Sequence, residues 1–585
     1  MAKPVYVLGT SLSHDGSVCL LKDGRVAVAI EKERITRRKH DGYNDTSAIE
    51  YCLNAASIKM TDLTLIVQNT WAGMFERGNA WFEGARILDP AIPVVTISHH
   101  LAHAYSAFAA SPYSEAHVLV IDNGGNGLDE CIDLDGAIIP VSPEPELRGL
   151  YSEVDSYYSF DSKGFRAIFK DFSPPGFQRK PYPMYPQPVM HSIGGVYKAV
   201  SQYIFKNIDD PGKLMGLAPY GHPGVYDFPM FDLRDGRVRV VYDWQNKFNT
   251  PARTFEDFKA NFQYYADIAY WTQKEIERAI VYVVESRLSI EASKSLCYAG
   301  GVALNAVANR HVLAHFPNVY IQPAAGDNGV SLGCAYFGWL RVLQRERVMH
   351  NGSTFFGAPY SRHDISCAIE KADALKLMHH CADYISETAR FLADGKIVAW
   401  FQKGAEFGPR ALGNRSVLAD PRRPEVRHFI NRYIKNREDF RPFAPSVLVE
   451  DQDIYFDCPV ESPYMILVAS VKAQWSSVIA SVVHRDLSSR VQTVAEEFNP
   501  IYYRLLSEFK KRTGIGVLLN TSLNQRGMPI VETPAQALDL FLHSAIDILV
   551  MEDYILCKPE LLMIRSQSSD SSEQRLYTQC DKLAK

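Results

Sequence analysis

The sequence predicts a mixed α/β protein with at least two domains, and three observations lead to this prediction. Its 585 residues exceed what a single hydrophobic core normally serves. It opens with three strand-like runs, 4–8, 18–21 and 26–30, of which the last two flank a Lys-Asp-Gly-Arg turn. Beyond them, apolar strand-like runs alternate with helix-like stretches, as expected for layers of helices and sheets.

The first predicted domain covers residues 1–355. A small-residue loop, Gly9 to Ser11, follows its first strand, which is how an actin-like nucleotide-binding fold begins. Further strands are expected at 64–68, 93–97, 117–122, 295–299 and 318–322, and helices at 99–111, 268–290 and 329–342. Residues 143–195 are crowded with Tyr, Phe, Pro and Ser. We expect no regular element there, but a surface excursion or a loop that shapes an acceptor pocket.

A linker near 350–362 leads into a second α/β domain, residues 356–565. Its strands are expected near 397–401, 444–449, 464–471, 516–520 and 546–550. The last segment, 566–585, is polar and Ser-rich and is predicted to be disordered.

Bulk composition excludes several classes of protein. Hydrophobic residues make up 46% and charged residues 22%, as in soluble globular proteins. A net charge of −5 gives no sign of a nucleic-acid partner, and no apolar run is long enough for a membrane span. The ten cysteines occur singly, without CxxC, and the N-terminus reads as a strand rather than a signal peptide. Together these features predict a cytoplasmic protein.

Two histidines and two distant aspartates form a candidate metal site. His99 and His103 are spaced i, i+4, so a helix would place both imidazoles on one face. Asp122 ends an apolar strand-like run, and Asp327 opens a Gly-flanked turn before a helix. Two imidazoles and two carboxylates suit iron, manganese or zinc, with positions left open for substrate. The alternative is that the histidines only cap and pack a helix.

A basic stretch predicts an anion site. Residues 399–445 hold ten Lys/Arg against five Asp/Glu, a balance of +5 in a protein of net charge −5. A solvated helix face would explain Arg422, Arg423, Arg427 and Arg432. It explains Arg410 and Arg415 less well, since they lie in the Gly/Pro-shaped string FGPRALGNRS between a strand and, we expect, a helix.

Lys435 and Arg441 lie in apolar surroundings in IKNREDFRPFAP. Arg490 follows later, and Asn520 and Ser522 come at the end of an apolar strand-like run. Guanidinium groups grip phosphate oxygens two at a time, and lysine adds a point charge. The sequence therefore predicts a pocket for a phosphate ester in the second domain.

Glycine-rich strings in the first domain are candidates for nucleotide binding. Gly300-Gly301 lies between a strand and a helix, where backbone can approach a phosphate; Asn305 is grouped with it. In DDPGKLMG, Asp210 could bind a ribose hydroxyl and Lys213 a phosphate, the alternative being an ordinary turn. No GxxxxGK[ST] string is present, so this is not a P-loop enzyme.

His14 follows the first loop of the predicted actin-like fold. With an ordinary pKa near 6.5, a histidine there could take a proton from a hydroxyl acceptor. The alternative is a loop histidine that is hydrogen-bonded to backbone.

A series of strings occurs in one order along nearly the whole chain: IEKERITRRKHDG, SHHLAHAYSAF, GKLMGLAPYG, YAGGVALN, GDNGVSLG, FGPRALGNRS, IKNREDFRPFAP, RVQTV and NTSLN. Together they resemble the O-carbamoyltransferases of the nodulation-factor and antibiotic-tailoring type, such as those that carbamoylate tobramycin, cephamycins and ansamycins. Lys32 departs from the family's acidic EEER run, and residues 143–195 match no family string.

This resemblance implies two linked catalytic centres. A YrdC-like C-terminal domain would form carbamoyl adenylate from carbamoyl phosphate and Mg²⁺-ATP, and Lys39 would reach it from the N-terminal domain. The residues implied to hold carbamoyl phosphate or its products are Arg410, Lys435, Arg441, Arg490 and Ser522, and Asn520 is grouped with them. A duplicated, actin-like N-terminal domain, similar to enzymes of tRNA threonylcarbamoyl transfer, would hold iron or a related metal and transfer the carbamoyl group. There His14 would act as the base and Gly300-Gly301 would hold the adenylate.

The resemblance implies an acceptor that is a hydroxylated small molecule, such as an antibiotic, a toxin or a glycoside. No nucleic-acid or membrane partner is expected; the oligomeric state stays open, with a homodimer among the options. Three alternatives remain. One is threonylcarbamoyl-type transfer to tRNA or carbamoyl transfer to protein. The second is a metallopeptidase, although no HExxH string is present. The third is a nucleotide sensor without catalysis.

Overall fold

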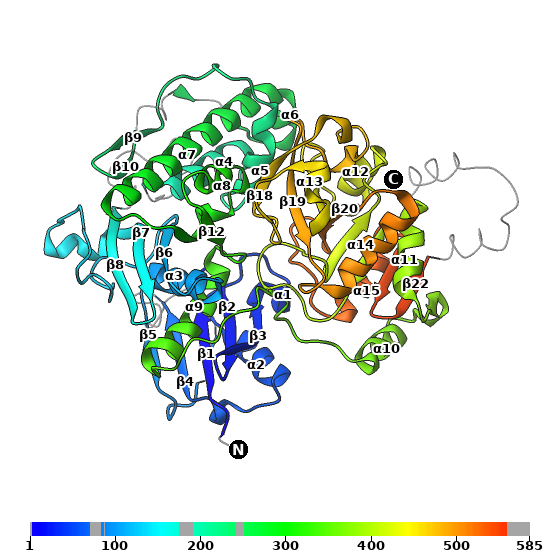
Figure 1. The fold of residues 1–585 in the computed structure, drawn as a ribbon, viewed down its shortest axis with the longest axis horizontal. Helices are drawn as coiled ribbons and strands as arrows, with labels where there is room; N and C mark the ends of the chain where they lie inside the picture. Colours follow the sequence, from blue (N-terminus) through cyan, green and yellow to red (C-terminus); the bar gives the residue numbers. More distant parts are fainter. Residues whose placement is uncertain are drawn as a thin grey trace, which may run out of the picture.

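The computed structural model describes residues 3–70, 84–86, 88–174, 191–241, 247–248 and 251–558. The predicted tail, 566–585, lies outside them. Figure 1 shows the N-terminal part of the chain, blue to green, beside the C-terminal part, yellow to red. Among the helices of the described residues, none combines the length and the apolar character that a membrane crossing requires.

The first sheet has the strand order β3-β2-β1-β4-β5. Its strands are β1 (Tyr6–Ser11), β2 (Ser17–Lys22), β3 (Arg25–Glu31), β4 (Leu65–Asn69) and β5 (Val94–Thr96). The first three are antiparallel neighbours, and β4 and β5 are added in parallel. The predicted hairpin is confirmed: its turn has Asp23 and Gly24 at φ values of 49° and 80°, the left-handed region that tight hairpin turns require.

The second sheet repeats the topology of the first. Read from β8, its order is β8-β7-β6-β11-β12, with an antiparallel triplet followed by two parallel strands. Its strands are β6 (Ala116–Ile121), β7 (Ser152–Asp161), β8 (Gly164–Ser173), β11 (Ser295–Ala299) and β12 (Asn318–Ile321). The chain therefore has the mixed α/β class that the sequence predicts, with a duplicated sheet in its N-terminal part.

The expectation of no regular element between residues 143 and 195 is wrong for 152–173. These residues form β7 and β8, and Tyr157, Tyr158 and Phe172 on them are at most 1% exposed. Tyr and Phe pack well on the pleated surface of a half-buried sheet, so their density indicates strands here rather than a loop. Residues 175–190 lie outside the described ones.

Helices α3 (His99–Ala110) and α9 (Val330–Phe337) lie between the two sheets and pack on each other. Helix α3 packs on β6, β7 and β11, whereas α9 packs on β1, β2 and β4. The predicted helix at 329–342 continues past α9 as a π-helical segment, Gly338–Val342. The remaining N-terminal helices are α1 (Lys32–Thr36), α2 (Thr46–Ala55), α4 (Ile193–Phe205), α5 (Pro211–Leu217), α6 (Phe255–Ala260), α7 (Phe262–Ile290) and α8 (Ala306–Leu313), and β9 (Phe231–Arg234) and β10 (Arg237–Val240) form a small hairpin.

The C-terminal part is built on one ten-stranded sheet, of order β13-β22-β21-β14-β15-β20-β16-β19-β18-β17. Its strands are β13 (Met378–His380), β14 (Val398–Phe401), β15 (Arg415–Ala419), β16 (Ala444–Leu448), β17 (Phe456–Asp457), β18 (Leu467–Val471), β19 (Ser488–Val494), β20 (Val517–Ser522), β21 (Ile548–Met551) and β22 (Tyr554–Cys557). Its helices are α10 (Arg362–Lys371), α11 (Tyr384–Ala393), α12 (Glu425–Phe429), α13 (Gln452–Tyr455), α14 (Pro500–Thr513) and α15 (Pro534–Leu542). The predicted boundary at 355/356 falls between the π-helical segment and α10, and it stays a prediction.

Gly333 permits the close approach of α9 to α3, and we predict that Gly333→Ala destabilises the protein. The added Cβ would stand 1.7 Å from the Ala102 carbonyl oxygen, so the two helices must separate. Such overpacking costs about 1–3 kcal/mol or more, measurable by urea unfolding. The control is Gly212→Ala on α5, where no atom lies within 4 Å of the new Cβ. An equal loss of stability in both variants would contradict this account.

Candidate functional site: a metal-ligand cluster and a basic cluster

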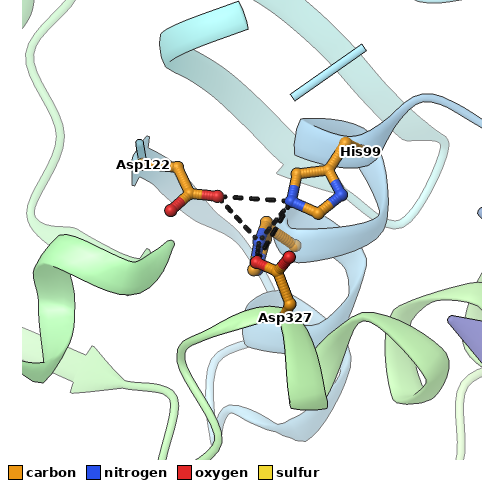
Figure 2. Close-up of side chains that lie close together, drawn as sticks. His99, Asp122 and Asp327 are labelled. Carbon is orange, nitrogen blue, oxygen red and sulfur yellow. Dashed lines mark hydrogen bonds and ion pairs between the residues drawn. The ribbon is translucent and has the colours of Figure 1, made fainter. Parts of the chain in front are cut away.

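The four predicted metal ligands converge in the N-terminal part. Figure 2 shows His99 on α3, Asp122 after β6, and Asp327 on the turn before α9 pointing toward one another. One donor atom from each of these residues and one from His103 lie within 4.8 Å of one another. Both ends of the duplicated fold thus contribute to one cluster, as the sequence predicts.

The imidazole nitrogens and the carboxylate oxygens of the cluster lie close together and interact electrostatically. The Nε2 atom of His99 lies 3.2 Å from Asp122 Oδ2 and 3.4 Å from Asp327 Oδ1. The Nε2 atom of His103 lies 3.5 Å and 3.7 Å from the same two oxygens. Burial alone would raise the pKa of Asp122, but hydrogen bonds with His103 and His99 outweigh it and hold that pKa low. Two imidazole nitrogens and two ionised carboxylates fit a divalent transition metal.

Asn69 fixes the orientation of His99. Its amide nitrogen donates to the Ile97 carbonyl at 2.9 Å and to Asn126 Oδ1 at 3.0 Å. Its oxygen, 2.9 Å from His99 Nδ1, must therefore accept a hydrogen bond from that ring nitrogen. Because Nδ1 is held as the donor, Nε2 is the ring nitrogen that would bind a metal in place of its proton, as ligating histidines require. Sequence reasoning missed Asn69.

A buried charge network supports the start of α3. Lys170 Nζ lies 2.5 Å from Glu153 Oε1 and 2.6 Å from Asp133 Oδ2, and all three side chains are wholly buried. The other oxygen of Glu153 accepts from the backbone N–H of His100 at 3.2 Å and of Asn126 at 3.1 Å. Cys131, Asp133 and Glu153 could also hold a metal ion, but the ammonium of Lys170 already pairs with both carboxylates. This network holds the helix that carries both histidines.

The Gly300-Gly301 turn abuts the metal-ligand cluster. The N–H of Gly301 donates to Asp122 Oδ1 at 3.0 Å. Gly300 has φ of 91°, and a Cβ there would stand 2.2 Å from the Ile121 carbonyl oxygen, so close packing on β6 itself requires glycine. Asn305 caps α8 through Ala308 N–H and pairs with Gln273. The side chain of Asn305 thus serves the protein's own structure.

His14 lies beside the metal-ligand cluster and has two charged neighbours. Its Nδ1 is 3.3 Å from Asp15 Oδ2, and its Nε2 is 3.4 Å from Lys198 Nζ on α4. Burial would lower the pKa of His14, but the carboxylates of Asp15 and Asp327 outweigh it and raise that pKa to about 9. Asp15 Oδ1 also lies 2.8 Å from His40 Nδ1. Lys198 gave no signal in the sequence.

Five cations gather in the C-terminal part, and we call them the basic cluster: Arg410, Lys435, Arg437, Arg441 and Arg490. Burial, followed by the charge of Arg441, lowers the pKa of Arg410 to about 10. Burial and the charges of Arg410, Arg437 and Arg441 hold the pKa of Arg490 far below its usual range. Within the described residues, the Nε atoms of Arg410 and Arg490 are buried without a hydrogen-bond partner. Unpaired, mutually repelling guanidiniums are the features of an anion site.

Lys435 is held at the end of β20. Its ammonium donates to the Ser522 carbonyl, to Ser522 Oγ at 3.2 Å and to Asn524 Oδ1 at 2.8 Å. Burial and the charges of Arg437 and Arg441, with that of Lys39, hold its pKa well below the usual range. Lys39 of the N-terminal part acts on Lys435 through its charge, while its own ammonium lies 3.3 Å from Glu33 Oε1. Asn520 lies deeper on β20, where it donates to Gln492 Oε1 at 2.9 Å.

Asp210 and Lys213 pair with each other at the boundary with the C-terminal part, and Lys213 also contacts a residue of that part. Lys213 Nζ is 2.7 Å from Asp210 Oδ2 and 3.3 Å from Glu438 Oε1. The same glutamate lies 3.4 Å from Arg526 and 4.0 Å from Arg441 of the basic cluster. Glu438, which sequence reasoning missed, is thus the acid that faces the basic cluster.

The other arginines of the basic stretch have structural partners. Arg415 begins strand β15, rather than preceding a helix, and donates to the Gln402 and Lys403 carbonyls while lying on the Phe401 ring. Arg422 pairs with Asp420 at 2.6 Å. Within the basic cluster, Arg437 donates to Asn431 Oδ1 at 2.7 Å and Arg441 faces Glu438, so Arg410 and Arg490 are the members whose Nε atoms are left for an anion.

Two family models match this chain. Residues 6–83 and 83–336 match the family model described as the carbamoyltransferase N-terminus, and residues 389–558 match the carbamoyltransferase C-terminus. A solved structure of full-length HypF in its phosphate- and nucleotide-bound form is 13% identical, covers 58% of this chain and 57% of its own, and has a TM-score of 0.36. That similarity is too weak to carry a functional argument.

Curated relatives span most of the chain. Nodulation protein NolNO of Sinorhizobium fredii is 32% identical over 94% of this chain and 80% of its own length. An uncharacterized protein of Synechocystis is 32% identical over 94% of this chain and 97% of its own. The 3'-hydroxymethylcephem-O-carbamoyltransferase of Amycolatopsis lactamdurans is 27% identical over 88% of this chain and 92% of its own. With both family models matched along most of its length, the chain belongs to the carbamoyltransferase family and is a carbamoyltransferase.

Proposed function

We propose that this protein is an ATP-dependent O-carbamoyltransferase that forms carbamoyl adenylate and passes the carbamoyl group to a hydroxyl of a small-molecule natural product. The observation that carries the proposal is the presence of a basic cluster with an excess of positive charge in one part of the chain and a metal-ligand cluster in the other. Membership in the carbamoyltransferase family favours this reaction over peptide hydrolysis.

The basic cluster suits the first half-reaction. Carbamoyl phosphate and water would give carbamate and phosphate, and a carbamate oxygen would attack the α-phosphorus of ATP to give carbamoyl adenylate and pyrophosphate. The reactants and both leaving groups carry several negative charges, which Arg410, Arg441 and Arg490 would stabilise. Lys435 would hold an anion as a point charge, with Lys39 adding a cation from the N-terminal part.

The metal-ligand cluster suits the second half-reaction, in which an alcohol attacks the carbamoyl carbon and AMP leaves. A divalent metal held by His99, His103, Asp122 and Asp327, with iron preferred and manganese or zinc as alternatives, would supply Lewis-acid polarisation. His14 would receive the proton of the acceptor hydroxyl, and Asp15 would orient its ring through Nδ1. Lys198, beside Nε2 of His14, only partly offsets the carboxylates that raise the pKa of His14 to about 9, so the neutral imidazole that accepts this proton would form as the pH approaches that value; Lys198 would also meet the adenylate phosphate.

An enclosed passage between the two clusters would protect the mixed anhydride from water. Such a passage needs the two parts to be in contact beside the basic cluster, and the ion pair of Lys213 with Glu438 is one such contact. The names of the relatives suggest nodulation-signal or antibiotic acceptors. We propose a hydroxylated antibiotic, toxin or glycoside as the acceptor and the cytoplasm as the location.

We predict that Arg441→Ala and His14→Ala separate the two half-reactions. Arg441→Ala removes a cation from the basic cluster and should lower carbamoyl-phosphate-dependent pyrophosphate release from ATP by about 100-fold or more, the scale expected when one transition-state donor is lost. His14→Ala should leave pyrophosphate release intact and block transfer. Mass spectrometry on a panel of hydroxylated acceptors, with tRNA included, would follow the gain of one carbamoyl group.

Damage by both substitutions to the same half-reaction would contradict the assignment of two separate centres. If tRNA is the only acceptor that is carbamoylated, the proposed small-molecule acceptor is wrong and the enzyme acts on tRNA. Cleavage of peptides without ATP would overturn the proposal.

We predict that Asp327→Asn abolishes tight binding of Mn²⁺, measured by equilibrium dialysis and elemental analysis. Loss of an outer partner such as a hydrogen-bonded carboxylate costs about 10- to 100-fold in metal affinity, so loss of a direct ligand should cost more. Glu33→Gln is the matched control, because Glu33 belongs to the second acid–histidine group with Asp15 and His40. If Glu33→Gln loses the metal and Asp327→Asn keeps it, the metal site is not the predicted cluster but the group of Asp15, Glu33 and His40.

A further inference from the structure

A buried ion pair at the end of β3 makes two hydrogen bonds with the backbone of one residue of the C-terminal part, Gly408. Glu31 and Arg34 are 5% and 2% exposed, and Arg34 Nε lies 2.8 Å from Glu31 Oε2. Glu31 Oε1 accepts from the N–H of Gly408 at 2.5 Å, and Arg34 Nη2 donates to the carbonyl of Gly408 at 2.7 Å. The pair therefore satisfies both polar backbone groups of Gly408.

Gly408 lies two residues before Arg410 of the basic cluster. Its φ of 120° belongs to the region that favours glycine, and a Cβ there would stand 3.3 Å from the Pro323 carbonyl oxygen and 3.4 Å from Ala324 Cα. The loop that carries Arg410 therefore packs against Pro323 and Ala324, which precede the predicted metal ligand Asp327.

The same carboxylate reaches the metal-ligand side. Asn328 Nδ2 lies 3.5 Å from Glu31 Oε1, and Asn328 directly follows Asp327. One oxygen of Glu31 thus contacts the loop of the basic cluster and the turn of the metal-ligand cluster. Lys32, the departure from the family's acidic run, takes no part, because its ammonium pairs with Asp41 at 2.8 Å and with the Gly42 carbonyl.

A buried charge pair is seldom retained for stability alone, because an apolar pair of similar volume is often as stable. We propose that Glu31 and Arg34 are positioning residues that couple the two clusters, so that anion binding at the basic cluster changes metal affinity at the other. This coupling rests on the proposed function, since it needs both sites to bind. Any shift of the Gly408 loop when Arg410 meets an anion is transmitted through Glu31 to the Asp327–Asn328 turn.

The test measures the Kd of Mn²⁺ by calorimetry on the full chain, with and without saturating carbamoyl phosphate, and then the reverse titration. In the unmodified protein we expect a change of about fivefold or more in the Mn²⁺ Kd, with an equal factor in the reverse titration, because coupling is reciprocal. The variant Glu31→Leu/Arg34→Met removes both arms of the grip and leaves no lone buried charge. Its coupling factor should fall to about one, with both ligands still bound.

Arg34→Lys is the milder variant, which keeps the charge opposite Glu31 and loses the fork that reaches the Gly408 carbonyl. It should reduce the coupling factor by at least about twofold, and it supports the test if the double variant does not fold. The matched control is Tyr51→Phe, which removes other, partly buried hydrogen bonds between the two parts: the one to Glu532 Oε1 at 2.5 Å and the one accepted from the Ala358 N–H at 2.7 Å. The control should keep the full factor.

Independent binding of Mn²⁺ and carbamoyl phosphate in the unmodified protein would overturn the coupling and leave the proposed function standing. Full coupling in Arg34→Lys, or equal loss in Tyr51→Phe, would also overturn the role of the pair. Failure of the unmodified protein to bind either ligand would overturn the proposed function and the coupling together.

Discussion

Repulsion among like charges is the constraint on which the C-terminal part depends. Besides burial, the charge of Arg441 lowers the pKa values of Arg410 and Arg437, and all three lower that of Arg490. Glu438 faces them 4.0 Å from Arg441 and is shared with Lys213 and Arg526. Removing charged groups from water without partners is unfavourable. The surrounding strands and the loop at Gly408 hold the cations together against this cost. An arrangement of this kind becomes favourable when a multiply charged anion enters it.

The metal-ligand cluster also carries a desolvation cost, because two carboxylates and two imidazoles are withdrawn from water at one point. Rigid supports solve it: α3 is buried along its whole length, Asn69 sets the His99 ring, and the Lys170–Glu153 pair holds the first turn of the helix. Ligands on fixed elements lose little entropy when a metal binds. Such preorganisation also explains why the helix contains His99 and His103 among mostly small and apolar residues, whereas His100 contacts Ser156 Oγ at 2.8 Å.

Local patterns in the sequence predicted the features that depend on local chemistry. The i, i+4 histidines, the hairpin at Asp23-Gly24 and the Gly/Pro-shaped loop of Arg410 each carry a backbone signature. The duplication of the two sheets did not appear as a sequence repeat, because topology constrains strand order and direction rather than residue identity. The tyrosines of β7 were misread because aromatic side chains are equally compatible with strands and with pocket-lining loops.

Contacts between distant segments could not be predicted from spacing. Asp210 and Lys213 read as a nucleotide loop, yet Lys213 pairs with Glu438 of the other part. Lys198 and Arg437 stand in ordinary helical and loop sequence, and only the fold brings them to His14 and to the basic cluster. The family resemblance supplied candidate residues for both clusters, whereas the grip of Glu31 and Arg34 on Gly408 required coordinates.

The free energy of urea unfolding of Arg490→Met, compared with the unmodified protein as pyrophosphate is added, tests the central claim most directly. If the basic cluster is held against its own repulsion for an anion, the variant should be the more stable protein without anion, since one of the repelling charges is gone. The unmodified protein should then gain more stability as pyrophosphate binds the folded state. A variant that is less stable without anion, and that gains as much from pyrophosphate, would contradict the account.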